Sequence, residues 1–148
     1  MRGIEHSLYI KARADEIYSI LTTTDGWNAW FTDETTLELS DDGSGEIRLQ
    51  WTNVGSEKKR MEDGGKILKA VYNKAFVFQW SPGDSITTVS MELTPHVDGT
   101  TVTVKDTGYT SSEKDTAACI HCAAGWGEAL LLLKIYVEHG IVYKHDLR

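Results

Sequence analysis

The feature that most constrains this chain is a long apolar segment near its C-terminus, in residues 112–140. Apolar or small side chains recur there three or four positions apart, at Cys119, Cys122, Trp126, Ala129, Leu130, Leu133 and Val137. This spacing is typical of the buried face of one long helix. Because most of the preceding chain reads as short alternating strands, we expect the helix to cover a sheet.

Two residue pairs are suited to begin this helix, and one glycine is suited to end it. Ser112 with Asp115, or Thr110 with Glu113, could cap its first turn. Gly140 is well placed to stop it, since glycine is the residue most often found just past a helix end.

Two shorter helices and seven strands are predicted in the rest of the chain. Residues 13–21 have a helical period, and residues 27–31 form a second short helix that Thr24 could cap. Alternating apolar and polar residues predict strands at 4–11, 35–39, 46–52, 66–72, 76–80, 87–93 and 100–109. Turn residues gather at 41–45, 63–65, 82–84 and 97–99, and residues 53–62 are polar enough to predict a loop.

These elements predict one α+β domain over residues 1–148, with a curved antiparallel sheet of about seven strands (or six) wrapped around the long C-terminal helix. Short connections make consecutive strands neighbours, so the sheet is antiparallel. Seven strands make a sheet about 34 Å wide, whereas one helix is about 10–12 Å thick. Space between the curved sheet and the helix is therefore expected, either filled by large side chains or open to a ligand.

Charge and composition exclude several classes of partner. The net charge is −7, so binding to nucleic acid would need a local basic patch. The one basic run, residues 58–60, is flanked by Glu57 and Glu62 and reads as a solvated loop. No uninterrupted apolar run approaches the roughly 20 residues of a membrane span, and the N-terminus lacks the apolar stretch of a signal peptide. We therefore expect no membrane partner and a cytoplasmic location.

No metal, cofactor or catalytic motif stands out. Cys119 and Cys122 share a helix face, but His121 is rotated away from Cys119 by about 200°, so the three cannot converge on one metal ion. The two cysteines read as small buried residues. Gly-rich phosphate loops and the usual hydrolase motifs are absent from the sequence. We therefore assign no catalytic residue, no metal and no cofactor.

The residues expected to line the interior are mostly large and apolar. They are Trp27, Trp30, Phe31, Trp51, Phe78, Trp80, Met91, Cys122, Trp126 and Leu130. They could pack a core or surround a ligand, because aromatic side chains dominate protein cores in any case.

Two polar residues are also expected to face inward. His6 alternates in phase with Ile4 and Leu8, and Asp106 alternates in phase with Val104. Together they could form a polar anchor or an acid–base pair at one end of the interior. We favour the alternatives, which are a structural hydrogen bond near the sheet's end or two exposed groups where the strands fray.

The order of these features resembles a known family. The chain is similar to the activator-of-heat-shock-protein-90-ATPase-like branch of the START-like, or SRPBCC, superfamily. The resemblance covers essentially the whole chain and is carried by Trp30-Phe31, residues 65–80, residues 99–104 with Gly108-Tyr109, and most specifically Gly125-Trp126 followed by residues 138–140. Between Trp30-Phe31 and the next strand, the family's proline-rich, double-glycine segment is replaced here by residues 32–36.

The resemblance implies the helix-grip fold and a ligand cavity. Our leading interpretation is a protein that binds a small, mainly hydrophobic molecule between sheet and helix. One alternative is a cyclase- or hydrolase-type enzyme that uses His6 and Asp106. Another is a protein-interaction module related to the chaperone activators, although the chain has no room for the separate chaperone-binding domain of the eukaryotic members. A homodimer stays open.

Overall fold

The computed structural model describes residues 2–54, 57 and 59–146. Over these residues the chain forms one seven-stranded antiparallel sheet, three α-helices and a short 3-10 helix, η1 (Lys144–Asp146). The strands are β1 (Arg2–Ile10), β2 (Glu34–Leu39), β3 (Gly45–Val54), β4 (Lys59–Val71), β5 (Ala75–Trp80), β6 (Thr87–Pro95) and β7 (Thr100–Tyr109). The helices are α1 (Ala14–Leu21), α2 (Thr24–Trp30) and α3 (Glu113–His139).

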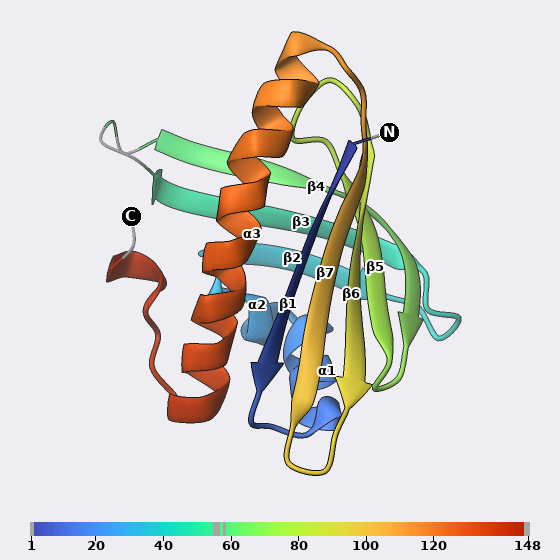
Figure 1. The fold of residues 1–148 in the computed structure, drawn as a ribbon, viewed down its shortest axis with the longest axis vertical. Helices are drawn as coiled ribbons and strands as arrows, with labels where there is room; N and C mark the ends of the chain where they lie inside the picture. The colour runs from blue at the N-terminus through green and yellow to red at the C-terminus, as the bar shows by residue number, and fades with distance from the viewer. Residues whose placement is uncertain (1, 55–56, 58, 147–148) are drawn as a thin grey trace.

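The strand order across the sheet is β1-β7-β6-β5-β4-β3-β2, so the first and last strands are neighbours. Ile10 pairs with Thr100 at one end of the β1–β7 ladder, and Ile4 pairs with Asp106 near the other. Figure 1 shows that β2, β3 and β4 pass behind α3 and run across the direction of β1 and β7. The sheet therefore curves around the long helix, which confirms the predicted α+β helix-grip architecture.

The inward face of α3 is the one that the apolar spacing predicts. Cys122, Trp126, Ala129, Leu130 and Leu133 are all buried. The helix packs mainly against β1, with fewer contacts to β7 and α2.

Both ends of α3 are also as predicted. The Ser112 hydroxyl accepts a hydrogen bond from the backbone N–H of Asp115, and Gly140 ends the helix in the left-handed conformation with a φ of 67°.

The sequence prediction is wrong around the start of β4. Residues 53–62 were expected in a loop and residues 63–65 in a turn, but residues 53 and 54 belong to β3 and residues 59–65 belong to β4. Residues 55, 56 and 58 of the expected loop lie outside the described residues. A Cβ atom on Gly64 would lie 2.1 Å from the carbonyl oxygen of Ile47 in β3. The glycine therefore permits close approach of two strands, a role that looks like a turn in sequence.

A smaller difference concerns the start of α2. The cap is Thr23, whose hydroxyl accepts from the backbone N–H of Gly26, and Thr24 is the first residue of the helix. The helix thus begins three residues earlier than predicted, and Gly26 is buried within its first turn.

Asp115 joins the loop before β6 to the loop before α3. Its buried carboxylate accepts hydrogen bonds from the backbone N–H groups of Asp84 (2.6 Å) and Ser85 (3.1 Å) and from the N–H and hydroxyl of Thr110 (both 2.7 Å). These bonds, those from Thr110 first, hold the pKa of Asp115 well below its usual range.

This lowered pKa predicts how stability depends on pH. The ionised carboxylate makes its full contribution to the free energy of unfolding above the unfolded-state pKa of about 3.9. This contribution is lost as the pH falls through the lower folded-state pKa. We expect the gap in unfolding free energy between the wild type and Asp115→Asn to be constant at neutral pH and to narrow below about pH 4. Urea denaturation at a series of pH values measures this gap. The control variant is Asp41→Asn, which removes an exposed carboxyl group. A gap unchanged from pH 7 to about pH 2.5 would contradict the assignment.

The segment after α3 is hydrogen-bonded to α2 and the loop that follows it. Lys144 is buried, and its ammonium group donates to the backbone oxygens of Asn28 and of Thr32, the latter at 2.5 Å. Asp33 lies 3.8 Å from the same ammonium group. A cation at the C-terminal end of a helix is favourable because the last carbonyl groups carry partial negative charge.

Of the described helices, only α3 is long and apolar enough to cross a membrane by length and composition, with a mean hydropathy of 1.4 over its 18-residue window. Core helices of globular domains also meet this criterion, and the inward face of α3 packs on the sheet. The absence of a membrane partner stays a prediction.

Candidate functional site

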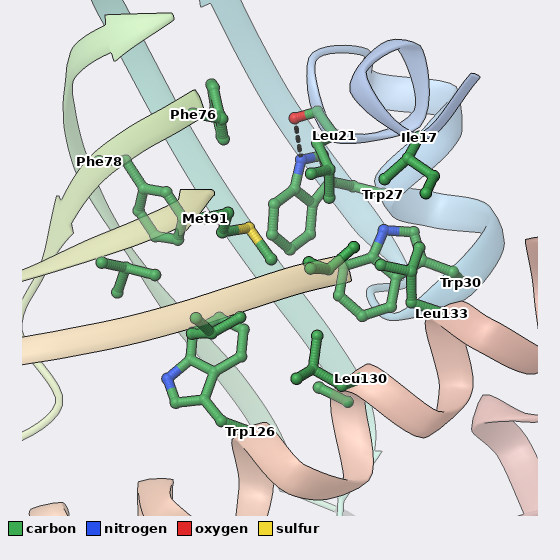
Figure 2. Close-up of a cluster of buried hydrophobic side chains, with 14 of the residues drawn as sticks. Ile17, Leu21, Trp27, Trp30, Phe76, Phe78, Met91, Trp126, Leu130 and Leu133 are labelled. Atoms are coloured by element: carbon green, nitrogen blue, oxygen red, sulfur yellow. Dashed lines mark hydrogen bonds between the residues drawn. The ribbon is translucent and has the colours of Figure 1, made fainter. Parts of the chain in front are cut away.

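Six aromatic rings form a closed circuit in the interior. Each ring centroid lies between 4.9 and 6.2 Å from the next, in the order Trp27, Trp30, Phe31, Trp126, Trp80, Phe78 and back to Trp27. Figure 2 shows how the labelled members of this group lie around Met91 and Leu130. Rings at these separations pack favourably beyond the area that they bury.

Helix α2 places one side of this aromatic circuit. Trp27 and Trp30 are three residues apart and thus share one helix face. The indole N–H of Trp27 donates to the carbonyl oxygen of Leu21 at the end of α1, at 2.7 Å (Figure 2). This bond holds the ring and ties the two short helices together.

The aromatic circuit reaches the surface on its β3 side. Phe31 stacks on Trp30 and also meets Trp51, with centroids 5.3 Å apart. Trp27 and Trp30 are buried, but Phe31 and Trp51 are only partly buried. The apolar interior therefore has a partly exposed margin beside β3.

The opposite end of the interior is polar and centred on Asp106. One of its carboxyl oxygens, Oδ2, accepts hydrogen bonds from the Tyr109 hydroxyl at 2.7 Å, the Trp126 indole at 3.1 Å and the Trp80 indole at 3.3 Å. The other, Oδ1, has a longer contact of 3.4 Å with Trp80. The side chain is fully buried, and all three of its donors are uncharged.

A β-bulge turns Tyr109 toward Asp106. Strict alternation would put Tyr109 on the opposite face of β7, since the two residues are three positions apart. Thr107 pairs with Gly3 and Tyr109 pairs with Arg2, which leaves Gly108 as the extra residue. Gly108 has a φ of 112°, which glycine adopts readily.

Groups near Asp106 have shifted pKa values. Burial, followed by the hydrogen bond to Asp106, raises the pKa of Tyr109 above its usual value. Burial, with the charges of Asp106 and Asp63, raises the pKa of Cys122 to about 11. Burial also raises the pKa of Asp63. The Cys122 thiol is therefore protonated at neutral pH and is a poor nucleophile.

The predicted pair of His6 and Asp106 is wrong. Both side chains lie on the inward face, as expected, and pair across the ladder with Val104 and Ile4. However, the Nε2 atom of His6 lies 2.7 Å from the carbonyl oxygen of Ala123 in α3, so the ring donates there. Asp106 is instead occupied by its two indole donors and its phenol donor. The alternation along each strand predicted the sheet face on which His6 and Asp106 lie, but not the groups that they bind.

The predicted lining residues thus divide into three groups. Six make the aromatic circuit, and Trp51 extends it toward the surface. Met91, Cys122 and Leu130 are buried in the same core. His6 and Asp106 bind separate partners, so no acid–base pair joins them. The other four histidines, His96, His121, His139 and His145, are exposed, as predicted.

Sequence reasoning missed three polar residues of this interior. Tyr109 was missed because the bulge reverses its phase, although a glycine within a strand signals such a bulge. Asp63 was assigned to a turn, but it pairs directly with the buried Leu49 and so faces inward. Thr87 opens β6 in phase with Val89, and its buried hydroxyl has no partner among the described residues.

A separate surface groove lies away from these residues. Its volume is about 460 Å³, and it is lined by residues 11–14 and 16, before and in α1, and by residues 95–99 of the β6–β7 hairpin. None of the twelve predicted residues contributes to it. The groove carries both charge signs, since Lys11 and Arg13 lie there with Glu16 and Asp98.

Comparison with known proteins agrees with this architecture. The model of the family described as Activator of Hsp90 ATPase homolog 1-like protein matches residues 11–138. The solution structure of the Aha1 dimer from Colwellia psychrerythraea is 27% identical, with a TM-score of 0.75 over 95% of this chain and 98% of that chain.

Two further structures share the fold. CalU16 from Micromonospora echinospora is 24% identical, with a TM-score of 0.72 over 93% of this chain and 74% of that one. The AHSA1-like protein from Aeromonas hydrophila is 16% identical, with a TM-score of 0.73 over 94% of both chains. A comparison with curated proteins gives no match. Because the family model spans most of the sequence, the chain belongs to the Activator of Hsp90 ATPase homolog 1-like family, within the START-like superfamily.

Proposed function

We propose that this protein binds a small, mainly apolar molecule between α3 and the curved sheet. The lining consists of Trp27, Trp30, Phe31, Trp51, Phe78, Trp80, Met91, Cys122, Trp126 and Leu130, with His6 and Asp106 at the polar end. Ligand sites in proteins are typically apolar and aromatic with a few placed polar groups, and this interior has that composition.

The observation that carries the proposal is the exposed margin of the aromatic circuit. Phe31 and Trp51 connect fully buried rings to the surface beside β3. Figure 1 shows β3 crossing behind α3, on the side of the sheet away from the β1 and β7 strands that support the helix. An apolar molecule would enter past these two side chains and displace Phe31 from its stack on Trp30.

Buried polar atoms without partners indicate what else the ligand carries. The indole N–H of Trp30 is buried and has no hydrogen-bond partner among the described residues. Such a group costs about 1–3 kcal/mol when it is left unpaired. A ligand oxygen that accepts from Trp30 would remove this cost. We therefore propose an apolar ligand with a carbonyl, ether or hydroxyl oxygen.

A catalytic role has less support. The enzyme alternative relied on a pair of His6 and Asp106, and these residues bind other groups. The buried thiol of Cys122 is held protonated by its raised pKa of about 11. Binding is therefore the function that the geometry favours.

A titration with N-phenyl-1-naphthylamine, a neutral apolar fluorophore, tests the proposal. We expect saturable one-to-one binding that quenches tryptophan emission by energy transfer, because the probe would lie against several indole rings. Replacing the partly exposed ring of Trp51 by Trp51→Gln should weaken binding at least about tenfold, since a buried aromatic contact of this size contributes about 1.5–3 kcal/mol.

The matched control for this titration is Leu68→Gln, which changes an exposed apolar residue of β4. It should bind the probe like the wild type. Non-saturable binding, or equal affinity in the Trp51 variant and the wild type, would rule out the proposed site. If the titration supports the site, native mass spectrometry of the purified protein would identify any co-purified ligand.

A homodimer is a second proposal, and it rests on the relative from Colwellia psychrerythraea, whose structure is a dimer. That relative is similar to this chain over almost its full length.

We also propose that the protein acts in the cytoplasm, since Cys119 and Cys122 are free thiols, as is usual in a reducing compartment.

A further inference from the structure

Helix α3 has a second apolar face, on the side away from the sheet. Ala117, Ile120, Ala124, Leu131 and Ile135 follow one another at steps of three, four, seven and four residues, so they form one stripe along the helix. Ile120 is 70% exposed and Leu131 is 52% exposed. We call these five residues the outer stripe.

The outer stripe is unusual for a helix at the surface. A surface helix ordinarily carries polar residues opposite its core face, and a helix that is apolar on all sides is ordinarily covered on all sides. In Figure 1 α3 lies in front of the sheet, with its outer side facing the viewer. Contiguous exposed apolar surface of this kind marks an interaction site.

We propose that the outer stripe binds the outer stripe of a second copy of this chain, with the two α3 helices antiparallel. This inference rests on the proposed homodimer and assigns its surface. A two-fold axis close to residues 124–128 would bring each stripe onto itself, as a symmetric dimer requires. Ile120 would then face Leu131 of the second copy, and Ala117 would face Ile135 of the second copy.

Charge complementarity selects the antiparallel arrangement. The flank of the stripe carries the exposed residues Lys114 and His121 toward the start of α3, and Glu128 in the second half. Antiparallel helices place His121 near Glu128 of the second copy. Parallel helices would place the two Glu128 carboxylates side by side, which is unfavourable.

The available area indicates a reversible dimer. A helix of 27 residues is about 40 Å long, so its outer side offers about 400 Å² per copy. The exposed residues Ile141, Val142 and Tyr143 continue the apolar surface beyond the helix end. The total area buried by the two copies lies near the lower limit of about 1,000 Å² for a specific interface. We therefore expect association at micromolar concentrations.

Analytical ultracentrifugation from about 1 to 200 μM tests the assignment over the micromolar range expected for such an interface. The wild type should shift from one to two chains of 16.5 kDa. Leu131→Glu should raise the dissociation constant at least about tenfold, because it buries a carboxylate without a partner. Ile86→Glu is the matched control: Ile86 is also exposed but lies in the loop before β6, and it should dimerise like the wild type.

Disulfide trapping tests the register independently. In a Cys119→Ala background, Ala124→Cys lies close to the proposed axis and should form a disulfide-linked dimer under mild oxidation. Ala117→Cys alone should not, because its partner position is Ile135 of the second copy. Mixing Ala117→Cys with Ile135→Cys should restore the linked dimer.

Three outcomes would overturn the inference. A dimer that persists unchanged in Leu131→Glu places the interface elsewhere and leaves the dimer proposal intact. A wild type that stays monomeric at 200 μM would contradict both the proposed homodimer and the assignment of its interface to the outer stripe. Sedimentation of a monomeric wild type with phosphatidylcholine–phosphatidylglycerol vesicles would assign the outer stripe to a lipid surface instead. The probe titration at Trp51 is unaffected by any of these results.

Discussion

Replacing Trp126 with alanine is expected to lower the free energy of unfolding by about 3–5 kcal/mol, the usual cost of removing a buried tryptophan. The indole is buried, lies between Phe31 and Trp80 in the aromatic circuit, and donates to Asp106. Domains of this size have only about 5–15 kcal/mol of stability. We therefore expect a denaturation midpoint far below that of the wild type, measured by urea unfolding.

Two control variants separate the loss of the buried ring from the loss of its N–H donor. Trp126→Phe keeps most of the buried area but loses the N–H group, so it should cost less than the alanine variant. Glu38→Ala changes an exposed residue of β2 and should stay within about 0.5 kcal/mol of the wild type. An alanine variant as stable as the wild type would show that Trp126 does not pack in this core.

Removing the carboxyl group of Asp106 is expected to have a comparable effect. Asp106→Ala leaves the Trp80 and Trp126 indoles and the Tyr109 hydroxyl without their shared acceptor. An unpaired buried donor costs about 1–3 kcal/mol, so the loss should reach about 3 kcal/mol or more. Asp106→Asn keeps one acceptor oxygen and should fall between the alanine variant and the wild type.

The Asp106→Asn variant also has a spectroscopic signature. In a ¹⁵N–¹H correlation spectrum, the indole N–H signals of Trp80 and Trp126 should move, because their acceptor changes. The signals of Trp27, Trp30 and Trp51 should stay close to their wild-type positions. Equal stability of all three proteins, or movement of all five indole signals, would contradict the proposed network.

Local patterns in the sequence predicted most of the fold. The spacing of apolar residues identified the buried face of α3, and Ser112 and Gly140 identified its ends. The prediction failed at β4, where Gly64 serves close packing between strands rather than a turn. Sequence shows where glycine occurs, but the reason for it here is a contact with Ile47, which is distant along the chain.

The candidate site was predicted less completely, for a related reason. Alternation along a strand predicts which face a residue joins, and it placed His6 and Asp106 correctly inward. The choice of partner depends on side-chain reach across several elements, so Asp106 binds two indoles and a phenol rather than His6. Tyr109 was hidden because the bulge at Gly108 reverses the alternation.

The pairing of β1 with β7 has a consequence for how the protein is made. Ile10 cannot meet Thr100 until nearly all of the sheet has left the ribosome. Until then β1 is a strand without its neighbour, and the hairpins from β2 to β6 form first because their contacts are local. Closing such a long loop is slow, and unpaired strand edges are prone to aggregate in the meantime. Pairing of β1 with β7 is therefore expected to be a late step in folding, after the local hairpins have formed.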